Sequence, residues 1–163
     1  MTADRASGPN PVTLLFRHVL QQRLRALVAP GARVAEVGAV DLASARDLDG
    51  AVAGPGVLEG SDLGALGRAL SAALRPGAPV LLCLGGGGAA RVDIGAAQAR
   101  LGPDLVWRRA FALGALVPSP SRHEWVRRHP QAFGLLAAAE RLVRAWPVLR
   151  LRGEYVVIEG ARR

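Results

Sequence analysis

The sequence predicts an α/β protein, a three-layer αβα sandwich around a mostly parallel sheet. Short apolar strand candidates alternate with helical segments, as in sheets whose strands are joined by crossover helices. The segment Pro79–Leu84 is continuously apolar, which is typical of a strand buried on both faces. The chain has 163 residues, the length of one ordinary domain. We expect residues 13–163 to form that domain, after a flexible arm over residues 1–12.

The first half of the chain predicts a helix, two short strands and a second helix. Leucine and valine recur at helical spacing before Pro30-Gly31, which ends the first helix. Ser61 or Asp62 can cap the second helix, because its side-chain oxygen can accept from a free backbone N–H group. The two helices are expected over residues 13–28 and from the cap to residue 74, and the two strands over residues 34–37 and 50–53.

The second half continues the alternation of strands and helices. Strands are expected over residues 79–84, 105–111 and 155–158, and helices over residues 89–100, 123–128 and 131–146. Pro118, Ser119 and Pro120 predict a turn. Arg162 and Arg163 are expected to form a charged tail.

All 21 basic residues are arginine, and the chain contains no lysine. A Walker-type phosphate loop, a Schiff-base enzyme and a kinase all need a lysine ammonium, so these three classes are excluded. The positive charge is concentrated toward the end of the sequence, where residues 101–163 carry eleven arginines against five acids. This excess indicates either a solvated basic face or a surface that attracts an anionic partner, such as nucleic acid or a lipid surface.

Cys83 is the only cysteine and lies within an apolar run. It can form no internal disulfide, which fits a reducing compartment, and we expect a buried, inert thiol. No apolar stretch reaches the length of a membrane span, and the N-terminus lacks the apolar region of a signal peptide. We therefore expect a cytoplasmic protein. His123 and His129 do not share a helical face, so no metal site is expected.

An acid two residues before a glycine ends the first strand candidate, in the segment Val34-Ala35-Glu36-Val37-Gly38-Ala39. This segment, with the helix and Pro-Gly turn before it, resembles the opening of class I S-adenosylmethionine-dependent methyltransferases. The resemblance implies a Rossmann-like fold and S-adenosylmethionine as cofactor. It also implies that Glu36 orients the cofactor's ammonium group, while Gly38 and Ala39 let the backbone approach the cofactor.

A second block is similar to the same family. The segment Gly50-Ala51-Val52-Ala53-Gly54-Pro55-Gly56 resembles the family's fourth strand and the loop after it. The resemblance implies that Gly54, Pro55 and Gly56 border the cofactor. The segment Leu74-Arg75-Pro76-Gly77 leading into an apolar strand, and the last strand from Tyr155, resemble the family as well.

The chain departs from the family's pattern in two places. Val40 and Leu42 stand where the family has further glycines, and we expect the Val40 side chain to take up space that the cofactor needs. The interval from Gly38 to Gly77 has room for one βαβ-sized unit, whereas the family has two additional strands there. The acid that grips the ribose in the family has no counterpart, because Asp41 and Asp47 do not end apolar runs.

Three functions remain open from the sequence. The first is a methyltransferase-like protein, with weakened or lost activity, that binds S-adenosylmethionine and acts on an unidentified small molecule. The second is a non-catalytic interaction or regulatory module of the same fold, with a protein partner or a second copy of the chain. The third is a basic binder of nucleic acid or anionic membrane through the arginines of residues 108–163, although few aromatic residues are present to stack on bases.

Overall fold

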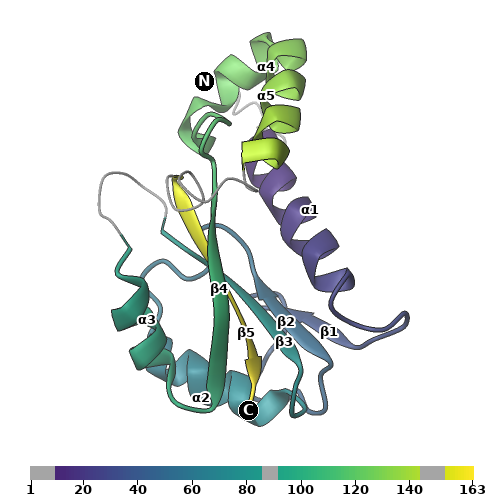
Figure 1. Cartoon of the computed structure of the whole chain (residues 1–163), viewed down its shortest axis with the longest axis vertical. Helices are drawn as coiled ribbons and strands as arrows, with labels where there is room; N and C mark the ends of the chain where they lie inside the picture. The colour runs from purple at the N-terminus through teal and green to yellow at the C-terminus, as the bar shows by residue number, and fades with distance from the viewer. Residues whose placement is uncertain (1–9, 86–91, 144–152) are drawn as a thin grey trace, which may run out of the picture.

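The computed structural model describes residues 10–85, 92–143 and 153–163, and it confirms the α/β class (Figure 1). Five strands form one sheet in the order β1-β2-β3-β5-β4. The strands are β1 (Val34–Glu36), β2 (Gly50–Ala53), β3 (Pro79–Leu84), β4 (Leu105–Leu113) and β5 (Tyr155–Arg162). The helices are α1 (Pro11–Arg25), α2 (Leu63–Ala73), α3 (Ile94–Leu101), α4 (His123–Arg128) and α5 (Pro130–Val143), with a 3-10 turn η1 (Pro120–Arg122) before α4.

The sheet is mixed, so the expectation of a mostly parallel sheet is wrong. The pairings of β1 with β2 and of β2 with β3 are parallel, whereas β5 pairs antiparallel with both β3 and β4. Tyr155–Ile158 is apolar at every position, and all four residues are buried. Apolarity on both faces predicts an interior strand but carries no information about its direction, so the sequence could not show that β5 enters antiparallel.

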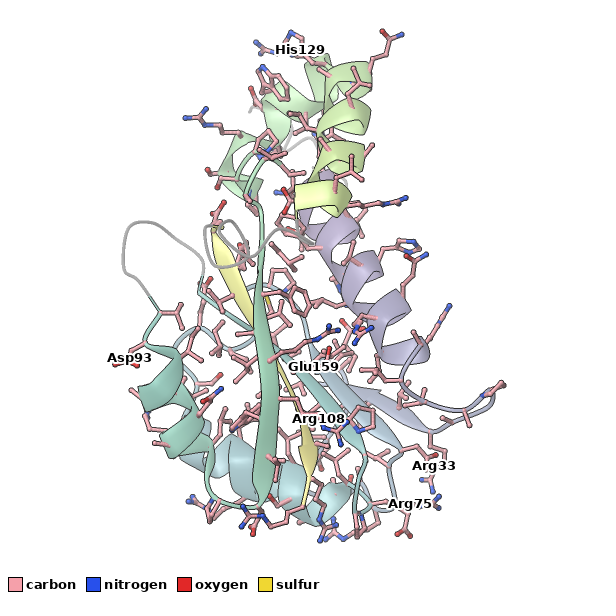
Figure 2. All side chains as sticks on the ribbon, in the orientation of Figure 1. Arg33, Arg75, Asp93, Arg108, His129 and Glu159 are labelled. Carbon is pink, nitrogen blue, oxygen red and sulfur yellow. The ribbon has the colours of Figure 1, made fainter. Side chains whose placement is uncertain are left out.

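Helices cover both faces of the sheet and form two apolar clusters (Figures 1 and 2). Helices α2 and α3 pack on one face, and α1 packs on the other. The cluster beneath α1 is built on Phe16, Leu20 and Leu24, all of which are almost fully buried. Helices α4 and α5 extend beyond the end of the sheet, beside the first turns of α1.

Helix α1 begins at Pro11, two residues before the expected start. The side-chain oxygen of Asn10 accepts hydrogen bonds from the N–H groups of Val12 and Thr13, at 3.0 and 3.4 Å, and so caps the helix. The Asn10 amide also donates to the carbonyl oxygen of Pro120, at 2.7 Å. Residues 10–12, which were assigned to the arm, therefore belong to the folded domain, while residues 1–9 lie outside the described residues.

Asp62, rather than Ser61, caps α2, because its carboxylate accepts from the N–H of Gly64 at 2.9 Å. Backbone N–H groups of Ala65 and Gly64 lower the pKa of Asp62. Strand β5 is longer than expected and includes Arg162, whose N–H donates to the carbonyl oxygen of Ala78 at 3.0 Å. Arg162 is therefore part of the sheet, and its assignment to a charged tail is wrong.

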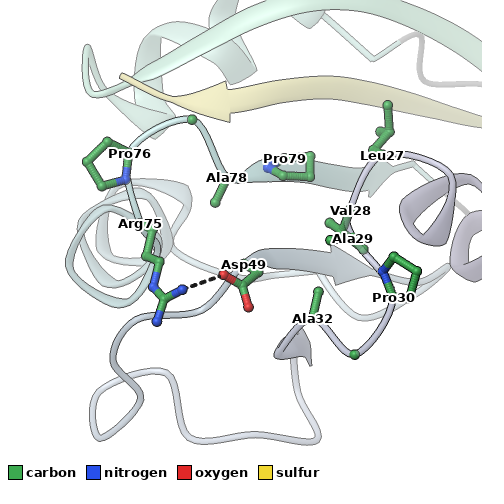
Figure 3. A pocket seen from close by; sticks show the side chains of 12 residues that line it. Leu27, Val28, Ala29, Pro30, Ala32, Asp49, Arg75, Pro76, Ala78 and Pro79 are labelled. Carbon is green, nitrogen blue, oxygen red and sulfur yellow. Dashed lines mark hydrogen bonds and ion pairs between the residues drawn. The ribbon is translucent and has the colours of Figure 1, made fainter.

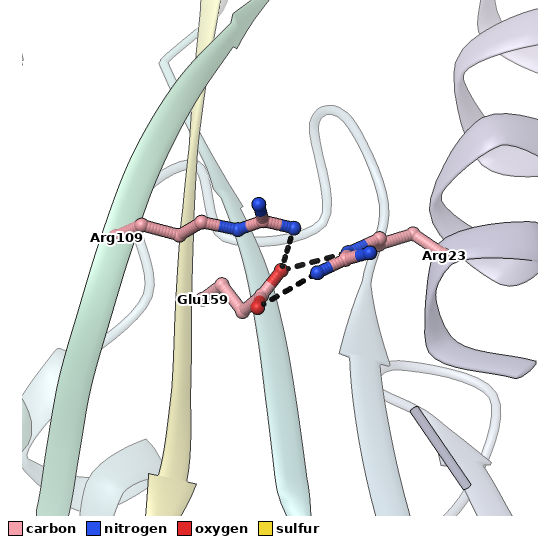
Figure 4. Close-up of polar contacts among 3 residues, drawn as sticks. All are labelled: Arg23, Arg109 and Glu159. Carbon is pink, nitrogen blue, oxygen red and sulfur yellow. Dashed lines mark hydrogen bonds and ion pairs between the residues drawn. The ribbon is translucent and has the colours of Figure 1, made fainter. Parts of the chain in front are cut away.

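Glu159 on β5 links three elements of the fold (Figure 4). Its carboxylate accepts two hydrogen bonds from Arg23 on α1, at 2.9 and 3.1 Å, and one from Arg109 on β4, at 3.0 Å. The Glu159 side chain is 7% exposed. Burial raises the pKa of this carboxyl, but the hydrogen bonds from Arg23 and Arg109 outweigh burial and hold it below its usual value. The ionised carboxylate therefore stabilises the contact of α1 with the sheet.

The substitution Glu159→Gln should lower the stability of the protein at neutral pH by about 2 kcal/mol, because it removes the charge that both arginines contact. The folded pKa lies below the unfolded value of about 4.3, so this stabilisation is present above about pH 5 and is lost as the pH falls below 4. Urea unfolding of wild type and variant at several pH values checks this. A difference between the two proteins that stays constant down to pH 3 would contradict it.

Gly67 allows α2 and α3 to approach each other closely. A β-carbon built at Gly67 would lie 1.8 Å from the carbonyl oxygen of Leu101. Gly134 is also inside a helix, α5, but a β-carbon there would meet no atom within 4 Å. The two glycines therefore differ in packing while sharing the low helix propensity of the residue.

Alanine at these two positions should have opposite effects. Gly67→Ala should lower the free energy of unfolding by about 3 kcal/mol, because backbone of α3 must move away. Gly134→Ala should raise it by about 1 kcal/mol, because alanine favours the helix and has space for its methyl group. Thermal unfolding followed by circular dichroism measures both, and equal shifts in the two variants would contradict the close approach of α2 and α3.

Candidate functional site

The carboxyl ends of β1 and β2 lie side by side and border a cleft. The two strands are parallel, with Glu36 opposite Val52, so the loops that follow them leave the same edge of the sheet. The cleft has a volume of about 410 Å³. Its lining residues, from α1 and from the two loops, are Thr13, Arg17, Glu36, Val37, Gly38, Ala39, Pro55 and Val57. We call it the β1–β2 cleft.

The structure brings together most of the residues that the sequence assigned to a cofactor site. Glu36, Gly38, Ala39 and Pro55 line the β1–β2 cleft. Gly54 lines a small hollow that also borders Arg17 and Glu36. Gly56 lines neither space, and its φ of +78° gives it a role in turning the loop after β2. Two segments that are about fifteen residues apart in sequence thus form one site, and ligands of open α/β sheets bind at this end of the strands.

Gly38 is required by the geometry of the loop after β1. Its φ is +89°, a conformation that side chains disfavour. A β-carbon at this position would lie 3.1 Å from Cγ1 of Val57, on the loop that follows β2. Any larger residue at position 38 would press the two loops apart and change the shape of the cleft.

Glu36 is the acidic group of the β1–β2 cleft, and α1 supplies its partners. Arg17 forms an ion pair with Glu36, and the Gln21 amide donates to the same carboxylate at 3.4 Å. The Arg17 side chain is 45% exposed and that of Glu36 is 24% exposed, so both charges remain accessible from the cleft. In the absence of a ligand, Arg17 compensates the charge of Glu36.

The sequence analysis missed the contribution of α1 to this site. Thr13, Arg17 and Gln21 are spaced four residues apart, which places them on one face of the helix, next to the buried stripe. That spacing of polar residues was the available signal. This spacing does not by itself say which strands the helix face will meet, so it predicts no contact with Glu36.

Neither Val40 nor Leu42 lines the β1–β2 cleft, so the Val40 side chain does not take up space within it. Val40 has a negative φ, is 43% exposed and does not line the cleft. It forms a bridge with Val37, while Leu42 turns into the core beneath α2. The two residues that stand where the family has glycines therefore belong to the turn after Gly38 and to the core, and they do not fill the cleft.

Strand β1 forms one edge of the sheet. In the described part of the chain, β2 is the only strand that pairs with β1, and the connection over residues 37–49 contains no helix. Asp41 accepts from the N–H of Ala43 at 3.0 Å and shapes a turn, and Asp47 is exposed with a φ of +56°. Neither acid follows a strand, so no residue in this connection replaces the ribose-binding acid of the family that the sequence resembles.

A second cavity, of about 420 Å³, lies at the opposite end of the strands (Figure 3). It is lined mainly by the loop after α1 and the loop before β3. Asp49 accepts from Arg75 at 2.9 Å and from the N–H of Arg33 at 2.8 Å, which ties these loops to the start of β2. Since this is the amino end of the parallel strands, we assign it a structural role.

The described residues hold no cluster of three metal-ligating side chains, and none of their helices has the length and apolarity needed to cross a membrane. His129 stacks on Trp125, with ring centroids 4.9 Å apart. The chain also contains a run of four glycines at residues 85–88 and a tryptophan at position 146, and of these only Gly85 is among the described residues.

Two comparisons with known proteins bear on identity. No protein-family model matches the chain, and no curated protein matches it either. The function must therefore be argued from the site itself.

Cys83 on β3 is 1% exposed, and burial raises the pKa of its thiol to about 12. The reactive thiolate is therefore scarce at neutral pH, and reagents cannot reach the sulfur. Ellman's reagent at pH 8 should leave the native protein unmodified and should modify one thiol per chain after unfolding in guanidinium chloride. Rapid modification of the folded protein would contradict the burial of Cys83.

Proposed function

We propose that this chain is an S-adenosylmethionine-dependent methyltransferase-like protein of Rossmann-like fold, whose cofactor site is the β1–β2 cleft. The observation that carries this proposal is that Glu36, Gly38, Ala39 and Pro55, from two separate sequence blocks, line one cleft. The cleft lies at the carboxyl ends of two parallel strands, where α/β folds bind nucleotides and related cofactors.

The residues of the cleft fit the amino-acid end of the cofactor. The Glu36 carboxylate can accept hydrogen bonds from an ammonium group, and the absence of a side chain at Gly38 leaves its backbone open to close approach. When bound, S-adenosylmethionine supplies an electrophilic methyl group. The cleft then contributes mainly position and orientation, so methyl transfer does not require a dedicated catalytic base.

The ribose end of the cofactor has less support. Strand β1 is the sheet edge, and no described residue beyond it offers a strand-terminal acid for the ribose hydroxyls. Arg17 also competes with any ligand cation for Glu36. We therefore propose weakened or lost methyl transfer, with a small molecule as the methyl acceptor and the cytoplasm as the location.

Isothermal titration calorimetry with S-adenosylmethionine and S-adenosylhomocysteine tests this proposal. The wild-type protein should bind at least one of them with a Kd below about 1 mM. Glu36→Gln should weaken binding about tenfold, because a charge-assisted hydrogen bond to the ammonium group is lost. Asp47→Asn is the matched control, because it removes an exposed acid outside the cleft, and its binding should equal that of wild type.

Absence of binding at millimolar concentrations of both ligands would overturn the cofactor site. Equal binding by wild type and Glu36→Gln would overturn the role of Glu36 while leaving the class of protein in place.

A second candidate function is a non-catalytic interaction module of the same fold. The open edge of β1 favours it, because an edge strand presents backbone groups that a further strand can pair with. Light scattering separates the candidates. A dimer or a stable complex without cofactor binding supports the module, whereas a monomer that binds the cofactor supports the first proposal.

A further inference from the structure

Helices α4 and α5 form an arm that projects past the end of the sheet (Figures 1 and 2). Glu140 on α5 fixes this arm to the loop after β4. Its carboxylate is fully buried and accepts from the N–H groups of Gly114 at 2.8 Å and Leu116 at 2.7 Å. These hydrogen bonds fix the position of the arm relative to the sheet.

The end of the arm is basic and carries an exposed aromatic side chain. We call it the basic tip, and it consists of Arg122, Trp125, Arg127, Arg128 and His129. All five residues are exposed. Glu124 is the one acid among residues 118–131, and it lies 3.5 Å from Arg128 in an exposed pair, which holds little energy. The tip therefore keeps a net positive charge.

The arm also exposes large aliphatic side chains. Leu135 and Leu142 are 74% and 75% exposed, the two highest values among the exposed large apolar residues of the described chain. They are seven residues apart on α5, with the exposed Ala138 between them, and so lie on one side of the helix. The arm thus exposes arginines and a tryptophan at its tip and two leucines along α5.

We propose that the α4–α5 arm binds the surface of an anionic lipid bilayer. Arginines attract acidic headgroups, while tryptophan and leucine side chains are stabilised where headgroups meet acyl chains. Tryptophan in particular favours this interface. The proposed association is peripheral, with the arm lying in the headgroup region.

Two observations favour a lipid surface over nucleic acid. The Trp125 ring is stacked on His129 at an interplanar angle of 23°, which occupies one of the faces on which a base would stack. Exposed leucines have no partner on a phosphate backbone but gain from burial in a bilayer interface.

Co-sedimentation of the full chain with vesicles tests the proposal. Vesicles that contain phosphatidylglycerol should bind the protein, and pure phosphatidylcholine vesicles should bind it far less. The double variant Arg122→Gln/Arg128→Gln should bind about 30-fold more weakly, since each arginine near an anionic surface contributes about fivefold. The control Arg33→Gln/Arg108→Gln removes the same charge from exposed positions far from the tip (Figure 2) and should bind like wild type.

Fluorescence gives a second readout. Tryptophan emission should shift to shorter wavelength on addition of phosphatidylglycerol vesicles, and Trp125→Phe should lose most of this shift. Equal loss of vesicle binding in both arginine double variants would show general charge attraction and overturn the assignment to the arm. Absence of vesicle binding at low salt would overturn the proposal, as would binding to single-stranded nucleic acid without binding to vesicles.

Discussion

The buried carboxylate of Glu159 connects helix α1 to the sheet. It lies on β5, whose backbone joins β3 to β4, and its side chain reaches Arg23 of α1 and Arg109 of β4. The Glu159 side chain is 7% exposed, while those of Arg23 and Arg109 are 35% and 48% exposed, so the carboxylate is compensated by two arginines that remain in contact with water. This contact and the apolar cluster beneath α1 together hold the helix on the sheet, and α1 supplies Thr13 and Arg17 to the β1–β2 cleft. The ion pair lies six residues after Arg17 on the same helix, so it helps to fix the side of the cleft that α1 forms.

The β1–β2 cleft, which is the cofactor site that we propose, lies beside the open edge of the sheet. The acid at the end of β1 and the glycine two residues later depend only on β1, β2 and α1, all of which are present. Binding of the ribose of the proposed cofactor would depend on a further strand next to β1. The connection over residues 37–49 does not supply such a strand in the described structure. Arg17 forms an ion pair with Glu36, so the charge of Glu36 is compensated when no ligand is bound.

The location of most elements could be predicted from the sequence, because local signals set them. The continuous apolar run of residues 79–84 and the short apolar segment of residues 50–53 became strands with the expected bounds. The direction of β5 could not be predicted, since its apolar pattern is the same for both directions. The early start of α1 has a local signal, because Asn10 is a favoured N-cap and Pro11 a favoured first helical residue, and only the contact of Asn10 with Pro120 requires tertiary structure.

Glu36 and Pro55 are expected site residues because of the resemblance to a methyltransferase family, and their function stays a prediction. The strand pattern explains only why they lie close together, since the carboxyl ends of the parallel neighbours β1 and β2 meet at one edge of the sheet. The partners on α1 could not be derived in the same way, because the angle at which a helix crosses a sheet is set by packing over its whole length. The position of Val40 could not be predicted either: it lies outside the lining of the cleft, and Leu42, two residues later, is buried in the core.

The interior place of β5 has a consequence for biosynthesis. Strands β3 and β4 are separated in the sheet by a segment that follows both of them in the chain, so the ribosome exposes them before their shared partner exists. Until that segment emerges, the nascent chain presents two unfilled hydrogen-bonding edges, of which β4 is nine residues long. Such edges promote association with other chains. Chaperone binding during translation is therefore expected to matter more for this protein than its small size suggests.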